Sequence, residues 1–137
     1  MKEQNMRFGD YIRKKRLADP RELTMQNVAD HLDISLSYMG AIENRRKPPF
    51  NGDKLEQLAE FLRLSEEETA LMFDLAGRET REVPYDIEDT LMYEEVGTLA
   101  RYALRQSKAG FIKEDDWKTF IREMEAKKGK GGDDDDG

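Results

Sequence analysis

Few residues in this chain of 137 could carry out catalysis or bind a metal. There is no cysteine, and His31 is the single histidine. The carboxylate pairs Glu94-Glu95 and Asp115-Asp116 stand in polar segments with no histidine, cysteine or glycine-rich phosphate loop beside them. Charge of this kind is typical of helix surfaces and helix N-termini. We therefore predict that the protein is not an enzyme, and we expect no cofactor and no metal site.

Positive charge is concentrated in the first part of the chain. Residues 1–50 carry ten Lys and Arg against seven Asp and Glu, a net charge of +3, whereas the remaining residues carry a net charge of -10. The basic residues include the run Arg45-Arg46-Lys47 and an earlier group, Arg13, Lys14 and Arg16. Lys and Arg are the residues that contact phosphate groups. The first part is thus a candidate for binding a polyanion, and the acidic remainder for facing water or a protein.

The elements that must position these residues are helical. Apolar side chains recur every three to four residues, and no long stretch alternates with period two, so we predict an all-α fold. In the N-terminal part we predict helices over Arg7–Ala18, from Thr24 to Asp33, from Ser35 to Asn44, from Asn51 through Leu62, and from Ser65 to a stop at Gly77. In the first helix, Phe8, Tyr11, Ile12 and Leu17 should face the core.

The remainder of the chain is predicted to form a separate region. A polar linker over 79–84 ends at Pro84, and helices follow at about Asp86–Ser107, either continuous or broken near Gly97, and at Glu114–Lys127. The last helix has an apolar stripe of Trp117, Phe120, Ile121 and Met124, which either packs on Val96, Leu99 and Ala103 or forms a dimer contact. We place domain boundaries at 1–78 and 79–127, and predict a disordered acidic tail over 128–137.

The second and third predicted helices have the features needed to hold one helix against another at a steep angle. Ala29 is small where the helices would cross, and Asp33 tolerates the left-handed backbone that a tight turn requires. Apolar residues stand at the inward positions of both helices and the turn, namely Val28, Leu32, Ile34, Met39 and Ile42. The outward positions of the third helix carry no large core residue, which leaves that side free for a groove about 12 Å wide.

Residues 23–49, LTMQNVADHLDISLSYMGAIENRRKPP, resemble the phage-repressor and Cro-like (XRE) family of helix-turn-helix transcriptional regulators, whose usual pattern is L-T-Q-x-x-L-A-x-x-L-G-V-S-x-S-x-I-S-x-I-E-x-G-x-R-x-P. The resemblance covers about Arg7 to Gly77 and implies a five-helix, lambda-repressor-like domain. Met25 departs from the usual glutamine, and Asp33 and Arg45 replace usual glycines.

The resemblance implies a role for each position of this motif. Leu36, Ser37, Gly40 and Ala41 would face the DNA bases. Thr24, Gln26, Ser35, Tyr38, Arg45, Arg46 and Lys47 would face phosphates, with Arg13, Lys14 and Arg16 as a second phosphate-contacting group. We expect Glu43 to cap a helix or form an internal ion pair, and His31 to lie on the surface opposite the core. None of the base-facing residues is a long bidentate donor, so reading would rely on thymine methyls, one hydroxyl and DNA shape.

The function that follows as an expectation is a sequence-specific transcription regulator in the cytoplasm, a repressor that binds double-stranded DNA as a homodimer. The alternative is an antitoxin-type protein whose acidic second half holds a partner protein while the first half represses its own promoter. No segment has the roughly 20 apolar residues of a membrane span, so we expect no membrane partner.

Overall fold

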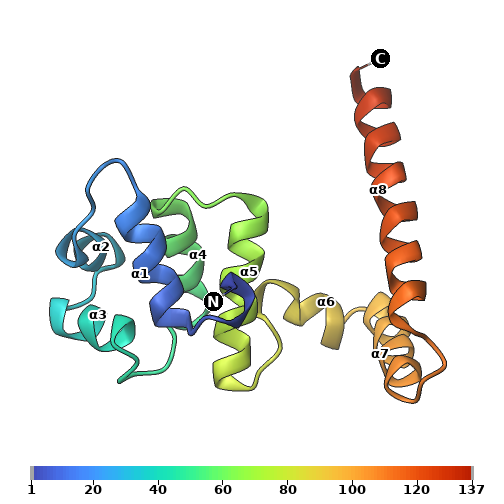
Figure 1. Ribbon diagram of the computed structural model, residues 1–137, viewed down its shortest axis with the longest axis horizontal. Coiled ribbons are helices and arrows are strands. Elements are labelled where there is room, and N and C mark those ends of the chain that lie inside the picture. The colour runs from blue at the N-terminus through green and yellow to red at the C-terminus, as the bar shows by residue number, and fades with distance from the viewer. Residues whose placement is uncertain (1, 137) are drawn as a thin grey trace. The chain divides into compact units, whose positions relative to one another are not determined.

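The chain folds into helices in both its halves. The computed structural model describes the backbone of residues 2–136 and the side chains of residues 2–130. Within this part of the chain there is no β-strand, which confirms the predicted all-helical class. The first five α-helices are α1 Phe8–Ala18, α2 Met25–Leu32, α3 Leu36–Glu43, α4 Gly52–Phe61 and α5 Glu66–Thr80, preceded by a 3-10 turn, η1, at Glu3–Asn5 (Figure 1).

Two compact units divide the chain, residues 1–89 and residues 90–137. In the first unit, α1 packs against α3 and α5, while α2 packs against α3 and α4 (Figure 1). One apolar core joins all five helices, and its side chains that are at most 1% exposed include Phe8, Tyr11, Ile12, Val28, Leu32, Met39, Ile42, Leu58, Met72 and Leu75. Burial of these amphipathic faces supplies the main stabilisation of the unit.

One predicted core position is wrong. Leu17 is 63% exposed, whereas Phe8, Tyr11 and Ile12 are each 1% exposed. The reason is helical geometry, since Leu17 follows Ile12 by five residues, or about 1.4 turns, and therefore lies on the opposite side of α1. Arg16 occupies the place at the core edge that we had assigned to Leu17.

The predicted end of α5 at Gly77 is also wrong. The helix continues to Thr80 and ends at Arg81, which has a left-handed backbone with φ 58°. Gly77 is needed for close approach instead: a Cβ placed there would lie 2.9 Å from the carbonyl oxygen of Glu82. Residues 79 and 80 of the predicted linker are therefore helical, and the chain after them folds back over the Gly77 surface.

Short helical elements lead from the first unit into the second. A 3-10 turn, η2 Tyr85–Ile87, closes the first unit, α6 Glu88–Met92 spans the boundary, and α7 Glu95–Lys108 follows, so the break in the predicted helix falls at residues 93–94. Gly97 lies just beyond this break. Glycine is required there, because a side chain would meet the carbonyl groups of Thr90 and Leu91. The last helix, α8, is Glu114–Asp136 and passes Lys127, where we had expected it to end.

The acidic tail is described only in part. The side chains of 131–137 and the backbone of Gly137 lie outside the described residues. The described backbone of 128–136, where we predicted disorder, continues α8. None of the described helices combines the length and the apolar character that crossing a membrane would take.

Candidate nucleic-acid interface

A tight turn connects α2 to α3 and sets the angle between them. Asp33 has φ 56° and ψ 49°, the left-handed conformation that we predicted for it, and the backbone N–H of Ile34 donates to the carbonyl oxygen of Ala29 at 2.9 Å. Ala29 is fully buried where the two helices meet. The turn and the small residue together hold α3 rigidly against α2.

The N-termini of α2 and α3 are both capped by hydroxyl side chains. Thr24 Oγ1 accepts a hydrogen bond from the backbone N–H of Asn27 at 3.0 Å, and Asn27 Oδ1 accepts from the backbone N–H of Thr24 at 2.9 Å. Ser35 Oγ accepts from the backbone N–H of Tyr38 at 3.0 Å. Each hydroxyl keeps its own proton to donate, and each lies at the positive end of a helix, where an anion is favoured.

The outer side of α3 is open, as its predicted role requires. Leu36 is 44% exposed, Ser37 is exposed and Ala41 is half-buried, while Met39 and Ile42 on the inner side are at most 1% exposed. These three outer side chains present methyl groups and one hydroxyl. Such groups can meet thymine methyls and accept or donate a single hydrogen bond at a base edge.

Gly40 is buried, although we had predicted it to be exposed on the outer side of α3. Because Gly40 has no side chain, neighbouring residues shield its backbone atoms from solvent. A Cβ built at Gly40 would nevertheless have no atom within 4 Å, so the position points into open space. The residue can therefore still allow close approach of an outside group, but its own atoms offer little surface.

The C-terminal end of α3 is fixed from inside by α1. Arg16 Nε donates to Glu43 Oε2 at 2.8 Å, Arg16 Nη2 donates to Glu43 Oε1 at 3.0 Å, and Arg16 Nη1 donates to the carbonyl oxygen of Leu23 at 3.0 Å. The hydrogen bond to Glu43 raises the pKa of Arg16. Glu43 thus forms the internal ion pair that we predicted, whereas the phosphate role predicted for Arg16 is wrong, because its guanidinium is buried and occupied.

Gly9 brings α1 and α3 into backbone contact at the same place. A Cβ at Gly9 would lie 2.8 Å from the carbonyl oxygen of Glu43 and closer still to that of Ile42. Only glycine lets the two helices approach this closely. The position of α3 therefore depends on Gly9 as well as on the Arg16–Glu43 ion pair.

An exposed basic run follows α3 directly. Arg45, Arg46 and Lys47 are all exposed, and the backbone N–H groups of Arg46 and Lys47 donate to the carbonyl oxygen of Ala41 at 2.8 and 3.2 Å. Arg45 has φ 64°, so it adopts the left-handed conformation of the glycine it replaces in the motif, and its Nε lies 4.0 Å from Asp10 Oδ1. The run is thereby held beside the C-terminal end of α3.

Some of the other side chains that we predicted to contact phosphate already interact with neighbouring residues. Gln26 Nε2 donates to Asp30 Oδ1 at 2.7 Å, and Lys14 Nζ lies 3.2 Å from Glu3 Oε2. Tyr38 is 39% exposed, and its ring lies 5.8 Å from that of Phe50. A phosphate would have to draw Gln26 and Lys14 from these carboxylates, whereas Arg13 is exposed on the same helix as Lys14.

A family model that describes a helix-turn-helix domain matches residues 7–72 of the chain. These residues form a helix-turn-helix domain. Its span contains α1 through α4 and the first half of α5, and with them the turn at Asp33 and the exposed side of α3. No curated protein and no solved structure matched the chain in the other two comparisons.

The helix-turn-helix domain places two further polar residues near the start of α3 that sequence reasoning missed. Lys54, on α4, donates through Nζ to the carbonyl oxygen of Leu32, and Asn51 caps α4 by accepting from the backbone N–H of Lys54 at 3.3 Å. Together with Ser35 and Tyr38 they line a depression of about 330 Å³. Only the packing of α4 against α2 brings Lys54 here, so no local sequence pattern indicates it.

His31 of the helix-turn-helix domain is exposed, as we predicted, yet it is not isolated. Its ring stacks on that of Phe61, with 4.2 Å between the ring centroids and 20° between the planes. Arg21 also lies over the Phe61 ring at 5.2 Å. The surface between α2 and α4 is therefore closed by an aromatic stack, which gives His31 a packing role.

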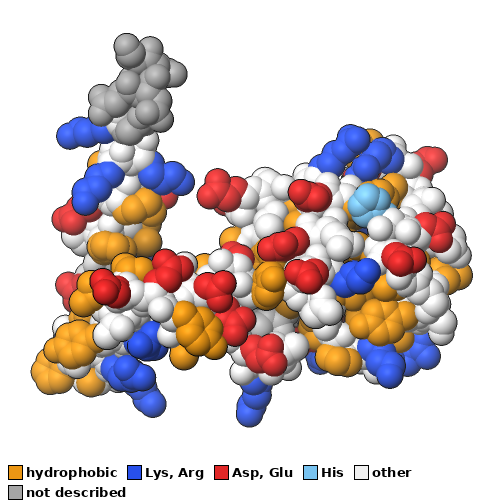
Figure 2. Space-filling model, turned by 180° about the vertical axis from the view of Figure 1, so that it is seen from behind, with side chains coloured by type: hydrophobic (Ala, Val, Ile, Leu, Met, Phe, Trp, Pro, Cys, Tyr) orange, Lys and Arg blue, Asp and Glu red, His pale blue; other side chains and the backbone are white. Residues whose placement is uncertain are grey.

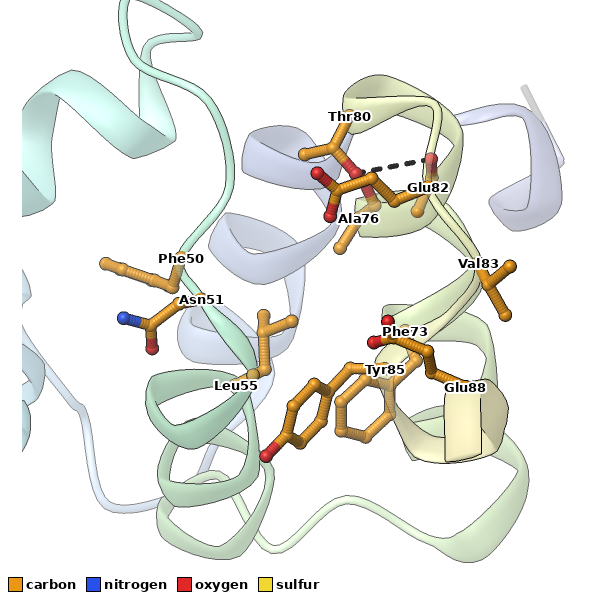
Figure 3. Close-up of a pocket in the computed structure, with 12 residues that line it drawn as sticks. Phe50, Asn51, Leu55, Phe73, Ala76, Thr80, Glu82, Val83, Tyr85 and Glu88 are labelled. Atoms are coloured by element: carbon orange, nitrogen blue, oxygen red, sulfur yellow. Dashed lines mark hydrogen bonds between the residues drawn. The ribbon is translucent and has the colours of Figure 1, made fainter. Parts of the chain in front are cut away.

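Beyond the matched span, the chain packs back onto the helix-turn-helix domain around the pocket shown in Figure 3. The pocket, of about 270 Å³, is bounded by Phe50 and Leu55 on one side and by Phe73, Ala76 and the 82–88 segment on the other. The Tyr85 ring lies 6.3 Å from that of Phe73, and its hydroxyl donates to Asp53 Oδ1 at 3.2 Å. The Asp53 carboxylate raises the pKa of Tyr85. Tyr85 thus fastens the 82–88 segment to α4 and α5.

Proposed function

We propose that this protein is a sequence-specific regulator of transcription that binds double-stranded DNA and represses the genes it binds. One observation carries the proposal: α3 is held rigidly from inside by Glu43, exposes Leu36 and Ser37 on its other side, and is followed by the exposed run Arg45–Lys47. A recognition helix needs this combination of an apolar or hydroxyl-bearing outer face and flanking positive charge.

The outer face of α3 enters the major groove. Leu36 and Ala41 contact thymine methyls and Ser37 forms one hydrogen bond, while Arg45, Arg46 and Lys47 contact phosphates, together with the Thr24 and Ser35 hydroxyls at the helix N-termini. Because α3 presents no bidentate donor, each base change in the site costs about 1 kcal/mol, at the low end of the usual range. DNA shape supplies the rest of the selectivity.

The protein acts as a homodimer in this proposal. One helix of eight residues contacts few base pairs, and a two-fold pair of such helices doubles the contacts on half-sites one helical turn apart. Repression is the proposed outcome because occupancy of a promoter is sufficient for it. We propose no catalytic activity, because the carboxylate pairs Glu94-Glu95 and Asp115-Asp116 have no histidine, cysteine or glycine-rich phosphate loop beside them in the sequence.

A footprint on the DNA that flanks the protein's own gene, at two salt concentrations, tests this function. We expect protection of two half-sites on one face of the helix, weakening as salt rises. Absence of protection at low salt would contradict DNA binding. Protection of all sequences equally would contradict sequence specificity.

The antitoxin alternative is supported by the exposed apolar side chains of the second unit. In that case the second unit holds a partner protein, and the first represses the operon that encodes both. Co-expression with the neighbouring gene discriminates the two functions, since an antitoxin would copurify with a small basic neighbour in fixed ratio. A simple repressor would purify without it.

A further inference from the structure

The second unit carries an open apolar groove between α7 and α8. Its volume is about 590 Å³, and its walls are Val96, Ala103 and Leu104 from α7, Ile112 from the connecting turn, and Trp117 and Phe120 from α8. Figure 2 shows hydrophobic side chains on the surface of these two helices. The apolar stripe of α8, for which we predicted either packing on α7 or a dimer contact, is only partly covered by α7: Trp117 and Met124 are half-buried, whereas Phe120 is 58% exposed.

Two linked hydrogen bonds through Ser107 preform the groove. Trp117 Nε1 donates to Ser107 Oγ at 2.8 Å, and Ser107 Oγ donates to the carbonyl oxygen of Ile112 at 3.0 Å. The end of α7, the turn and the first turns of α8 are thereby tied to one another. A partner that enters the groove meets an ordered surface, which lowers the entropic cost of binding.

The second unit has almost no interior of its own. Among its described residues only Gly97 is buried, and seven large hydrophobic side chains are more than half exposed: Tyr93, Val96, Leu99, Tyr102, Leu104, Phe111 and Phe120. In the described part of the first unit, Leu17 alone exceeds that limit. Exposed apolar surface that is this dense and confined to one unit is typical of an interaction surface.

A helical unit of this size without a core is stabilised by disulfides, by metal or by association. The chain has no cysteine, so the first route is closed. Nor do the described residues include a group of His, Cys, Asp or Glu that would hold a metal ion. Association is the route that this composition leaves.

We infer that the groove between α7 and α8 is covered by the same groove of a second copy, so that the two hairpins together form a four-helix core. The area is adequate, because the six exposed side chains other than Phe111 lie on α7, on α8 or directly before α7. At roughly 100 Å² each, they supply about three quarters of the roughly 800 Å² that each partner buries in a stable complex. Charge also favours a second copy. The C-terminal half of α7 carries Arg101, Arg105 and Lys108, and the first turn of α8 carries Glu114, Asp115 and Asp116. Each copy thus carries both a positive and a negative segment beside the groove, so a two-fold pair has opposite charges available to pair across the interface.

This inference names the surface behind the homodimer of the proposed function, and it is tested without DNA. The test is sedimentation equilibrium of the full chain, comparing wild type with Phe120→Glu and Phe111→Glu. Phe120 lines the groove, whereas Phe111 is the same residue type, is more exposed at 80%, and does not line the groove. We expect wild type and F111E to be dimeric at micromolar concentration, and F120E to be monomeric, with its dissociation constant raised at least 100-fold.

A second variant keeps the test independent of any one side chain. Leu104→Glu alters the opposite wall of the groove, at a residue that is 52% exposed, so it leaves the fold of the monomer intact. It should also give a monomer, with an unchanged circular dichroism spectrum. A monomeric wild type, or dimers of both F120E and L104E, would overturn the inference. Because no DNA is present in this experiment, neither result bears on DNA binding, which the footprint tests separately.

Discussion

Arg16 on α1 and Glu43 on α3 form a two-point ion pair, at 2.8 and 3.0 Å, behind the C-terminal end of the helix that carries Leu36 and Ser37. The Glu43 side chain is 3% exposed and that of Arg16 is 10% exposed. Water therefore cannot replace either partner, and the pair determines how α3 sits relative to the core.

Removal of one partner of this pair should be costly. Arg16→Met leaves the Glu43 carboxylate buried and unpaired, so we expect a loss of about 3 kcal/mol in the free energy of unfolding. The double variant Arg16→Met with Glu43→Leu should regain a large part of that loss, because no buried charge remains. Urea unfolding of the single and double variants measures this coupling, and losses that simply add would contradict it.

Two glycines of the helix-turn-helix domain should respond oppositely to alanine. Gly9→Ala forces a Cβ against the carbonyl groups of Ile42 and Glu43, and we expect it to destabilise the protein by about 1–3 kcal/mol. Gly40→Ala adds a Cβ in open space within a helix and should stabilise it by up to about 1 kcal/mol. Thermal denaturation of the two variants checks the signs, and destabilisation by Gly40→Ala would show that its space is not open.

Acidification should remove the contribution of Asp19 to the stability of the folded protein. Hydrogen bonds from the Arg21 side chain and backbone lower the pKa of Asp19 to about 2. Because its pKa is lower in the folded than in the unfolded protein, the stabilisation is present above about pH 4 and is lost as the pH falls through 2. Asp19→Asn should thus be less stable than wild type at neutral pH, with the gap closing on acidification. Urea midpoints across this range test it, and a gap that is independent of pH would contradict it.

Charge removal should separate phosphate contacts from base contacts. Arg46→Gln should weaken binding to all duplexes to a similar degree and reduce the salt dependence by about one ion, whereas Ser37→Ala should change the preference among sequences. Lys118→Gln, which removes the same charge from the second unit, serves as the matched control and should leave binding unchanged. Fluorescence anisotropy with a panel of duplexes at several salt concentrations measures both effects. Base-selective loss in R46Q would contradict its assignment.

The parts of the fold that could be predicted are those that local chemistry determines. The caps at Thr24, Ser35 and Ser65 and the left-handed residue Asp33 follow from side chains that bond their own backbone or tolerate positive φ. The burial of Val28, Ala29, Met39 and Ile42 follows from helical period.

What could not be predicted depends on contacts between segments far apart in the sequence. The sequence predicts a surface position for Arg16, because only the fold places Glu43 of α3 beside it. Likewise, Lys54 lies near α3 only because α4 packs against α2. The sequence predicts that Gly77 ends a helix, whereas in the structure Gly77 allows the backbone at Glu82 to pack closely against α5. The apolar stripe of α8 indicates that something must cover it, but not that α7 covers only part of it and leaves Phe120 more than half exposed.

The most direct test of DNA reading by α3 is a titration of the isotope-labelled protein with duplex DNA from its own promoter, followed by amide resonances. We predict that the amides of residues 35–47 shift on binding, and that those of α7 and α8 do not. A spectrum that stays unchanged at low ionic strength, or shifts confined to residues outside 24–54, would contradict the assignment of α3 as the helix that reads DNA.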